Sequence, residues 1–509
     1  MRLVPAAVTG WAVTATGILW PVGGAVAAMC VLAALGAALA RARATTDGGR
    51  AVSTGLIAVA VVGVGFGMAI MLRANGVRDH PIGQLFGAAA VVTVTPTESP
   101  RAVGTGRLMV KADLEWVDEH ETSGQVVVFA SAQGFAAVTA GQPIRFTARV
   151  SRPTRRDLSV AVLTATGAPA MGQASAVQRF AASVRGRFAA AARDVLPAGQ
   201  AAMLPALVLG DTSAMTAPVV AEYRAAGLTH LTAVSGANVT IVCGAVLMAA
   251  YLVGPRAAVG LAALALIAFV IVVQPTASVL RAAVMGAVTL LAILSSRRRQ
   301  AIPALSATVL VLMIIAPQLA VDVGFALSVS ATAALVLIAP VWSRRLVARG
   351  WPKPLADAIG VASAAQLVTA PLVAGISGTF SLVAVIANLA VAAVVAPITV
   401  LGTAAAALGL VWPGAADLLI RFTGPELWWL GAVAHRAAGV PNATVPVPSG
   451  GVGVLTVAFA GLTVVVLWRW RWFRRAVLCV VVCLLAWSLS ALVAGHGATV
   501  SADRGTIVA

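Results

Sequence analysis

Polar side chains and glycines recur inside apolar stretches of this 509-residue chain, where hydrocarbon would otherwise surround them. Such groups are costly in lipid unless they face protein or water. A hydrated passage needs hydroxyls, amides and a few cations that stabilise a solute without trapping it. We therefore interpret the following residues as candidate lining of a transport pathway: His230, Ser235, Gly236, Asn238, Ser278, Arg281, Ser328, Gln366 and Asn388.

Arg281 is the cation of this set, and three interpretations of it remain open. Its guanidinium could hold a phosphate group through two parallel hydrogen bonds. It could instead pair structurally with Asp322 or Glu222, since charges inside spans face a cavity or a partner. It could also extend along the helix to the membrane surface.

Three acidic residues are candidates for structural or gating roles. Asp322 precedes an apolar run and is expected to cap the helix that follows. Asp211 and Glu222 are expected at the outer membrane face, where a turn or cap role competes with a functional one. His230 suits a proton-linked switch, although a histidine satisfied at a helix entrance is the simpler interpretation.

Composition assigns most of the chain to lipid. Hydrophobic residues make up 60% and charged residues only 10%, against about 25% charged in soluble domains. The pattern of apolar runs predicts an α-helical membrane protein with about 11–13 spans, some of them short and broken. The net charge of +18 falls largely in short loops between these runs, as the positive-inside rule describes.

The basic loops also predict an orientation. If all of them lie in the cytoplasm, residues 77–170, the loop 413–450 and the C-terminus lie outside. Tryptophans near the same boundaries suit aromatic belts at the two membrane interfaces. The basic loops contain Arg41, Arg43 and Arg50; Arg256; Arg297, Arg298 and Arg299; Arg344, Arg345, Arg349 and Lys353; and Arg469, Arg471, Arg474 and Arg475.

Residues 77–170 differ in sequence pattern from the rest of the chain, because short β-branched runs alternate with Gly, Pro and Ser turns. Such a pattern predicts a small all-β domain, for which a five-stranded OB-type barrel is the natural candidate. The expected strands cover 91–95, 107–117, 125–130, 143–150 and 158–165.

An arginine cluster in this β-domain could contact DNA or anionic lipid headgroups. It consists of Arg145, Arg149, Arg152, Arg155 and Arg156. Aromatic residues that could stack on bases are more simply explained as filling of the barrel, namely Trp116, Phe129, Phe135 and Phe146.

The domain boundaries follow from these patterns. We expect N-terminal transmembrane helices over 1–74, the extracellular β-domain over 77–170 and an amphipathic interfacial helix over 175–200, with Phe180, Val184, Phe188 and Val195 on its apolar face. A transmembrane core over 203–412, an extracellular loop over 413–450 and C-terminal helices with a short tail over 451–509 complete the chain. Gly63 and Gly67 suit close helix packing.

Catalytic chemistry is not indicated. The four cysteines lie in apolar runs and form no CxxC pattern, so neither a disulfide framework nor a metal site is expected. The sequence has no Walker pattern. We therefore expect neither an enzyme nor a cofactor, and energy for directed movement would come from a partner or the membrane potential.

Four motifs, in order, resemble those of the ComEC family, the membrane channels of bacterial competence. The first is Gly-Leu-x-His-Leu-x-Ala-x-Ser-Gly-x-Asn-Val at 227–239. The others are similar to a Ser-x-x-Arg-Ala-x-x-Met block at 278–285, a Gly-Phe-x-Leu-Ser-x-x-Ala block at 324–331 and a Gln…Pro-Leu…Asn-Leu block at 366–389. The resemblance covers residues 50–410 well and the last hundred residues only loosely.

The resemblance implies a channel that passes one strand of external DNA into the cytoplasm during natural transformation. It also implies an external DNA receptor, a cytoplasmic ATPase or helicase-like motor, and a homodimer. Two features depart from the family. Asn238 stands where many members have histidine, and the five histidines are too scattered for the HxHxDH cluster of the C-terminal metallo-β-lactamase-like domain that many members carry. A separate nuclease is therefore expected.

Two other functions remain open. A secondary transporter or lipid-handling permease with an accessory β-domain would also have spans interrupted by Gly and Pro, with charges inside them. A scaffold that anchors an assembly without conducting anything is the third possibility.

Overall fold

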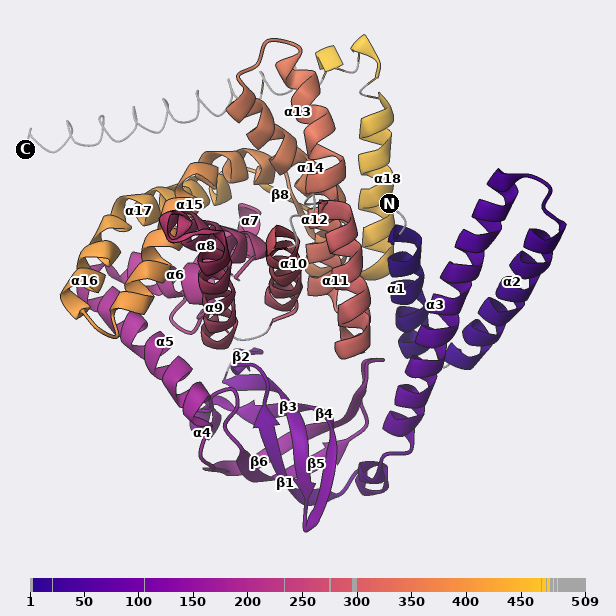
Figure 1. Ribbon diagram of the computed structural model, residues 1–509. Helices are drawn as coiled ribbons and strands as arrows, with labels where there is room; N and C mark the ends of the chain where they lie inside the picture. The colour runs from indigo at the N-terminus through magenta and orange to yellow at the C-terminus, as the bar shows by residue number, and fades with distance from the viewer. Residues whose placement is uncertain are drawn as a thin grey trace, which may run out of the picture.

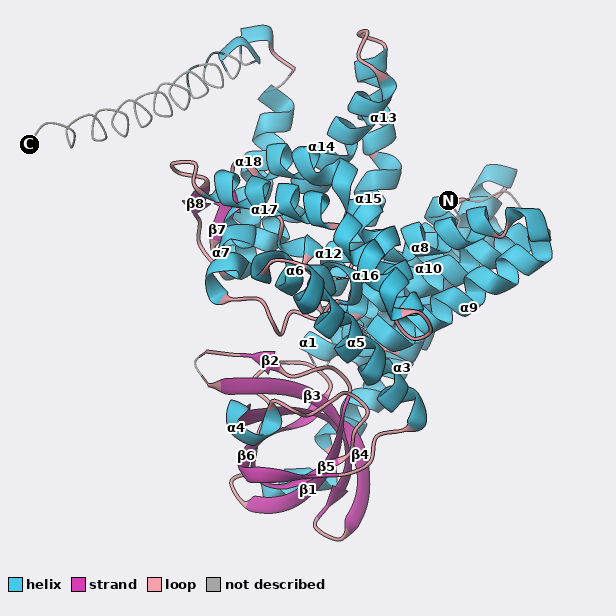
Figure 2. Ribbon diagram, turned by 90° about the vertical axis from the view of Figure 1, so that its left-hand side faces the viewer, coloured by secondary structure: helices cyan, strands magenta, loops and turns pink. Residues whose placement is uncertain are grey.

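The computed structural model describes residues 3–476 except 21, 105, 233, 274–275, 295–299, 468 and 473, together with 479 and 483. Helices dominate, and a compact β-domain lies at one end of them (Figures 1 and 2). The predicted last span at 476–495 falls almost entirely outside the described residues, as do Arg297, Arg298 and Arg299.

Three helices form the N-terminal part, α1 (Val4–Leu19), α2 (Gly23–Arg43) and α3 (Asp47–Arg78). Glycines let α2 and α3 approach closely, as the sequence predicts. A Cβ added to Gly63 would lie 2.6 Å from Cys30 Sγ, and one added to Gly67 would lie 2.9 Å from Ala27 Cβ. Helix α3 continues through the 3₁₀ turn η1 (Pro81–Leu85) into the β-domain.

The β-domain comprises β1 (Ala89–Pro96), β2 (Arg101–Ala102), β3 (Arg107–Val117), β4 (His120–Ser131), α4 (Ala132–Phe135), β5 (Ile144–Ser151) and β6 (Ser159–Met171). The strand order is β1-β5-β6-β4-β3-β2, and β1 also pairs with β3, which closes the sheet into a barrel. Strands β4 and β6 pair in parallel and the other pairs are antiparallel. The five predicted strands are confirmed.

Alternation of apolar and polar residues fills this barrel. Val92, Val94 and Phe146 point inward and are buried. Phe135 and Phe146 meet edge to face with ring centroids 5.3 Å apart, so these two aromatics belong to the core, as expected. Trp116 does not, because 41% of it is exposed.

Helix α5 (Ala176–Val195) connects the barrel to the remaining helices. Its buried face consists of Ala181, Val184, Phe188 and Ala192. Phe180, predicted on that face, is 53% exposed, because the helix has turned it past the packed side. Arg185 of α5 donates from Nη1 to the Val272 carbonyl oxygen, 2.8 Å away. Burial lowers the pKa of this guanidinium, although Asp211 opposes the shift.

The membrane core follows in chain order. Its elements are α6 (Ala198–Leu209), α7 (Ala217–Ala225), η2 (Thr229–Leu231), α8 (Gly236–Ala249), η3 (Tyr251–Val253), α9 (Pro255–Val273), α10 (Ala277–Leu294), α11 (Ala301–Ile315), η4 (Pro317–Val321), α12 (Val323–Leu337), α13 (Ala339–Val347), α14 (Lys353–Ser377), β7 (Thr379–Ser381), α15 (Ala384–Leu408), α16 (Pro413–Phe422), α17 (Gly424–Ala438), β8 (Thr444–Pro446) and α18 (Gly450–Leu467).

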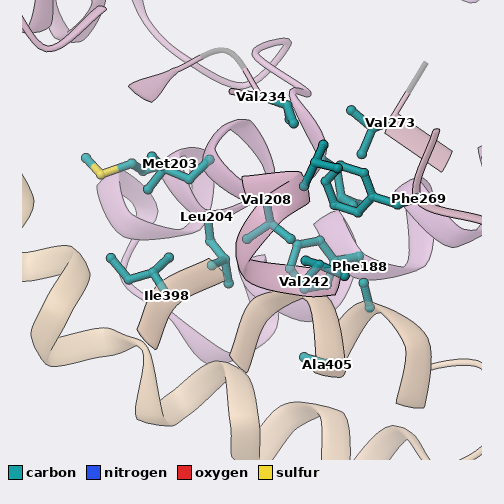
Figure 3. Close-up of a cluster of buried hydrophobic side chains, with 14 of the residues drawn as sticks. Phe188, Met203, Leu204, Val208, Val234, Val242, Phe269, Val273, Ile398 and Ala405 are labelled. Atoms are coloured by element: carbon teal, nitrogen blue, oxygen red, sulfur yellow. The ribbon is translucent and has the colours of Figure 1, made fainter. Parts of the chain in front are cut away.

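Helices distant in sequence share one apolar core (Figure 3). Phe188 of α5, Val208 of α6, Val242 of α8 and Phe269 of α9 meet there, and Ile398 reaches them from α15. Burial of such side chains stabilises by about 1.5–3 kcal/mol each. This core fixes the starts of α8 and α10, where the candidate pathway residues lie.

Eight helices among the described residues are long and apolar enough to cross a membrane. By length and composition they are compatible with a multi-pass membrane protein. Four shorter apolar helices accompany them, α1, α6, α8 and α11, in keeping with the expected short spans.

Residues 413–450 are not the loop that the sequence predicts. They form α16, α17 and β8, and β8 pairs with β7. Ile420, Leu427 and Leu430 are fully buried against the main core. The helical spacing of these apolar residues is hard to recognise in the sequence, because Pro and Gly interrupt it.

The turn between α2 and α3 and the turn between α13 and α14 lie at the end of the molecule opposite the β-domain (Figure 1). These turns carry Arg41, Arg43 and Arg50, and Arg344, Arg345, Arg349 and Lys353. These two basic turns and the β-domain therefore lie at opposite ends of the molecule.

Candidate functional site

The first turn of α8 is held by an amide. Ser235 precedes the helix in an extended conformation but makes no capping hydrogen bond, because its hydroxyl donates to Asn238 Oδ1 at 3.3 Å. Asn238, 5% exposed, donates from Nδ2 to the Leu207 carbonyl oxygen at 2.8 Å. Carbonyls in the last turn of a helix lack partners within it, so Asn238 joins the start of α8 to the end of α6.

Arg281 lies one turn into α10 and is 6% exposed. Its Nε donates to Ser328 Oγ of α12 at 2.6 Å, and its Nη1 contacts Met285 Sδ at 3.2 Å. The Ser328 hydroxyl also lies 3.3 Å from Ser278 Oγ. The guanidinium is thus held by hydroxyl and thioether groups between two helices.

Gly236 joins the hydrogen bonds of Asn238 at the start of α8 to those of Arg281 between α10 and α12. A Cβ on this residue would overlap Nη2 of Arg281, so the guanidinium lies directly against the first turn of α8. We call Ser235, Gly236, Asn238, Ser278, Arg281 and Ser328 the α8 cluster. It unites six of the predicted pathway residues.

The acidic candidates do not neutralise Arg281. Asp322 accepts from the Phe325 amide at 2.8 Å and caps α12, as expected. Glu222 lies 3.0 Å from Nδ1 of His435, and Asp211 accepts from the Ser213 amide at 3.1 Å within a turn. Of the three interpretations of Arg281, the structural pairing with Asp322 or Glu222 is therefore excluded among the described residues. Within the described part of the chain, no carboxylate lies within ion-pair distance of Arg281.

Asn388 acts on the segment that precedes α8. It donates from Nδ2 to the Gly227 carbonyl oxygen at 3.3 Å and to Ala384 at 2.8 Å. Ser381 donates to the Ala225 carbonyl oxygen at 2.7 Å. Gly227 has φ +71°, and a Cβ there would overlap Ala384. The end of β7 and the start of α15 therefore hold residues 217–231, which we call the strap.

Sequence reasoning missed Ser381, Met285 and His435 as members of this network. Ser381 and His435 make contacts across 156 and 213 residues respectively, so no local pattern could mark them. Two predicted pathway residues stand apart from the α8 cluster. His230 is exposed on η2, and Gln366 is half-buried on α14.

Space beside the α8 cluster is small. A cavity of about 10 Å³ lies next to Ser235 and Asn238, which is room for about one water molecule. Its other walls are apolar except for one hydroxyl: Leu207, Leu231, Val395, Ile398, Thr399 and Leu430. The polar groups are thus gathered beside a space for about one water molecule in this conformation.

The β-domain arginines divide into two groups. Arg145 and Arg149 point outward from β5, with Thr93 directly across from Arg145 and Trp116 across from Thr93. The others lie on the turn after β5 beside the helices. Arg156 donates to the Leu19 carbonyl oxygen of α1 at 3.0 Å, Arg152 stacks on Phe86 at 5.5 Å, and Arg155 is exposed.

Comparison with known proteins gives one match. A family model described as "Competence protein" covers residues 207–472, from the end of α6 to beyond α18. The matched region contains the α8 cluster and the strap but excludes the β-domain. No curated protein and no solved structure matches the chain significantly.

Proposed function

This chain belongs to the competence protein family, and we propose that it is an inner-membrane channel that passes single-stranded DNA from outside into the cytoplasm during natural transformation. The family indicates a role in DNA uptake and transport rather than catalysis. The channel, its substrate strand and the direction of passage are our proposal.

The observation that carries the proposal is the charge of Arg281. A cation buried among membrane helices is costly without a counter-charge, and here it abuts the N-terminus of α8, which carries partial positive charge itself. Like charges in contact destabilise the empty site. A phosphodiester passing between them would supply the missing negative charge, as anions at helix N-termini do.

Passage then requires a conformational change, since the cavity beside Asn238 holds only about one water. We propose that the strap moves, because it precedes α8 directly. Its movement would break the hydrogen bonds from Ser381 and Asn388 and the contact between Glu222 and His435, which hold it to its neighbours in this structure. We infer that this structure is the closed state.

We further propose that the barrel is of the OB type and lies outside. Its closed order β1-β3-β4-β6-β5, the parallel pair β4–β6, and the short α4 between β4 and β5 support the OB type. The basic loops at the opposite end would then be cytoplasmic. Arg145 and Arg149 beside exposed Trp116 suit contact with a single strand.

Partners would complete the process. An external receptor would deliver DNA, a cytoplasmic ATPase or helicase-like motor would pull it, and a separate nuclease would remove the other strand. A homodimer is part of the same proposal.

The test is uptake of labelled DNA by cells whose chromosomal copy carries Arg281→Ala or Asn388→Ala. We expect internalisation to fall by about tenfold or more, with surface binding and membrane levels unchanged. Arg281→Lys should be equally harmful, because an ammonium cannot replace a planar two-pronged donor. Arg73→Ala is the matched control, since Arg73 only binds the Ile314 carbonyl oxygen at 3.0 Å. Unchanged uptake in a deletion strain would sink the proposal.

A secondary transporter or permease is the second candidate. Helices α6, α14 and α15 contain internal prolines, Pro205, Pro371 and Pro397, and spans that contain Gly and Pro, with a charge among them, suit a small-solute carrier too. Normal DNA uptake in the deletion strain, together with a defect in a lipid or metabolite, would favour it.

A further inference from the structure

A hollow of about 560 Å³ opens where α5 meets the β-domain. This volume lies within the range of about 300–1,000 Å³ typical of ligand sites. In Figure 1, α5 reaches the barrel beside α4. Polar and small residues line the hollow, from the turn before β5, the turn after β6 and the first turns of α5: Thr139, Gln142, Gly172, Gln173, Ala174, Arg179 and Ala182.

Hydrogen bonds fix the wall of the hollow without a ligand. Gln142 donates from Nε2 to the Gly172 carbonyl oxygen at 3.0 Å and accepts from the Thr139 hydroxyl at 3.1 Å. The Gly172 amide in turn donates to the Pro143 carbonyl oxygen at 2.7 Å. The two barrel turns are therefore tied together and present a fixed polar surface.

The charge in this wall is positive. Arg179 is the charged residue of the lining, and its Nη1 folds back to the Ala174 carbonyl oxygen. It forms no ion pair with any described residue. The N-terminus of α5 lies beside it, where Ser175 caps only the Gln178 amide, and a helix of 20 residues carries partial positive charge there.

The hollow lies on the side of α5 away from the packed helices. Ala181, Val184 and Phe188 make the buried face of α5, whereas Arg179 lies on the opposite side and Ala182 on the flank at 100° per residue. Arg179 is exposed there.

A line of cations leads to the hollow. Arg149 and Arg145 alternate with buried residues along the exposed face of β5, about 13 Å apart at 3.3 Å per residue. The strand begins two residues after Gln142, which lines the hollow. Arg149 and Arg145 therefore lie on the strand that follows the hollow, and Arg179 lines the hollow itself.

We propose that this hollow binds a phosphodiester group of a nucleic-acid strand and holds that strand at the junction of the barrel and α5. The inference rests on the proposed function, which supplies DNA as the polyanion. Recognition is of the backbone and independent of base sequence, since the charged and amide donors suit phosphate oxygens.

The experiment uses the purified full chain in phosphatidylcholine nanodiscs and a fluorescent oligothymidylate of about 10 nucleotides. Arg179→Gln should weaken binding, measured by anisotropy, about tenfold at low salt. It should also reduce the slope of log affinity against log salt by about 0.7. Ala182→Trp, which fills the hollow and keeps every charge, should weaken binding as well.

Arg187→Gln is the matched control, because Arg187 is an exposed arginine of the same helix outside the hollow. Binding by this variant should equal that of the unaltered chain. Equal losses in Arg179→Gln and Arg187→Gln would mean diffuse electrostatic attraction and overturn the proposal, as would unaltered binding by Arg179→Gln and Ala182→Trp.

A second measurement tests whether the hollow binds the phosphate of a lipid headgroup instead of that of a nucleic acid. If Arg179→Gln leaves oligonucleotide binding intact but reduces retention of phosphatidylglycerol from mixed nanodiscs, the hollow is a lipid-headgroup site and the proposal is wrong.

Failure of the proposed channel function gives a different result from failure of the binding site. A deletion strain with normal uptake, combined with hollow-dependent oligonucleotide binding in nanodiscs, would refute conduction and leave the binding site standing.

Discussion

The guanidinium of Arg281 rests against the backbone of Gly236, so that α10 and α8 touch through a cation and a residue without a side chain. The contact depends on two distant positions in the sequence. Neither position alone reveals it, since a glycine at a helix start and an arginine in an apolar run each have ordinary explanations.

Gly236→Ala tests this contact directly. The added methyl overlaps Nη2 of Arg281, and overpacking of a tight site costs about 1–3 kcal/mol. We expect DNA uptake to fall at least as far as in Arg281→Lys, with the protein still in the membrane. Gly244→Ala on the same helix is the control, because a Cβ there meets nothing within 4 Å. Equal uptake by the two alanine variants would contradict the arrangement.

Movement of the strap can be blocked chemically. Glu222 on α7 and His435 on α17 lie 3.0 Å apart through their side chains. With both replaced by cysteine, a short bis-methanethiosulfonate reagent, which forms a disulfide with each thiol and releases methanesulfinate, should join α7 to α17 and abolish uptake. A thiol reductant cleaves these disulfides and should restore uptake. Each single-cysteine variant treated alike controls for modification of the native cysteines. Full uptake by the cross-linked protein would show that α7 stays in place during passage.

Capping of α12 has a measurable stability effect. Asp322→Ala removes the acceptor of the Phe325 amide, 2.8 Å away, and should destabilise the detergent-solubilised protein by about 1 kcal/mol. The lower melting temperature is read in a thermal scan. Asp322→Asn retains a capping oxygen and should melt near the unaltered protein. If the two variants melt alike, the cap contributes little.

Attachment of the barrel to α1 depends on one arginine. Arg156→Gln loses the 3.0 Å hydrogen bond to the Leu19 carbonyl oxygen, which closes the last turn of α1. We expect faster hydrogen–deuterium exchange in peptides from the end of α1 and from the turn after β5. Arg155→Gln on the same turn should exchange normally. Identical exchange in both variants would mean that Arg156 does not tether the barrel.

Much of the fold follows from residue periodicity, because period-two alternation in 91–165 and long apolar runs elsewhere are strong local signals. The strands of the β-domain match their predicted positions for this reason. Helices α16 and α17 were not foreseen, since Pro413, Gly424 and Pro425 interrupt the apolar face that Ile420 and Leu427 bury.

The candidate site was foreseen less completely. Residue type identified Arg281 and Asn238, because polar groups in apolar runs require a reason. Their partners could not be read from the chain. Ser328 is reached across 47 residues and the Leu207 carbonyl across 31, and only the packing of α6, α8, α10 and α12 brings these groups within bonding distance.

The barrel is fastened at three points. Chain enters it from α3 through η1, chain leaves it into α5, and Arg156 binds the end of α1. A domain held by two chain connections and a side-chain hydrogen bond has less freedom to rotate than a domain on one flexible linker. Tilting of α1, α3 or α5 would therefore move the barrel with it.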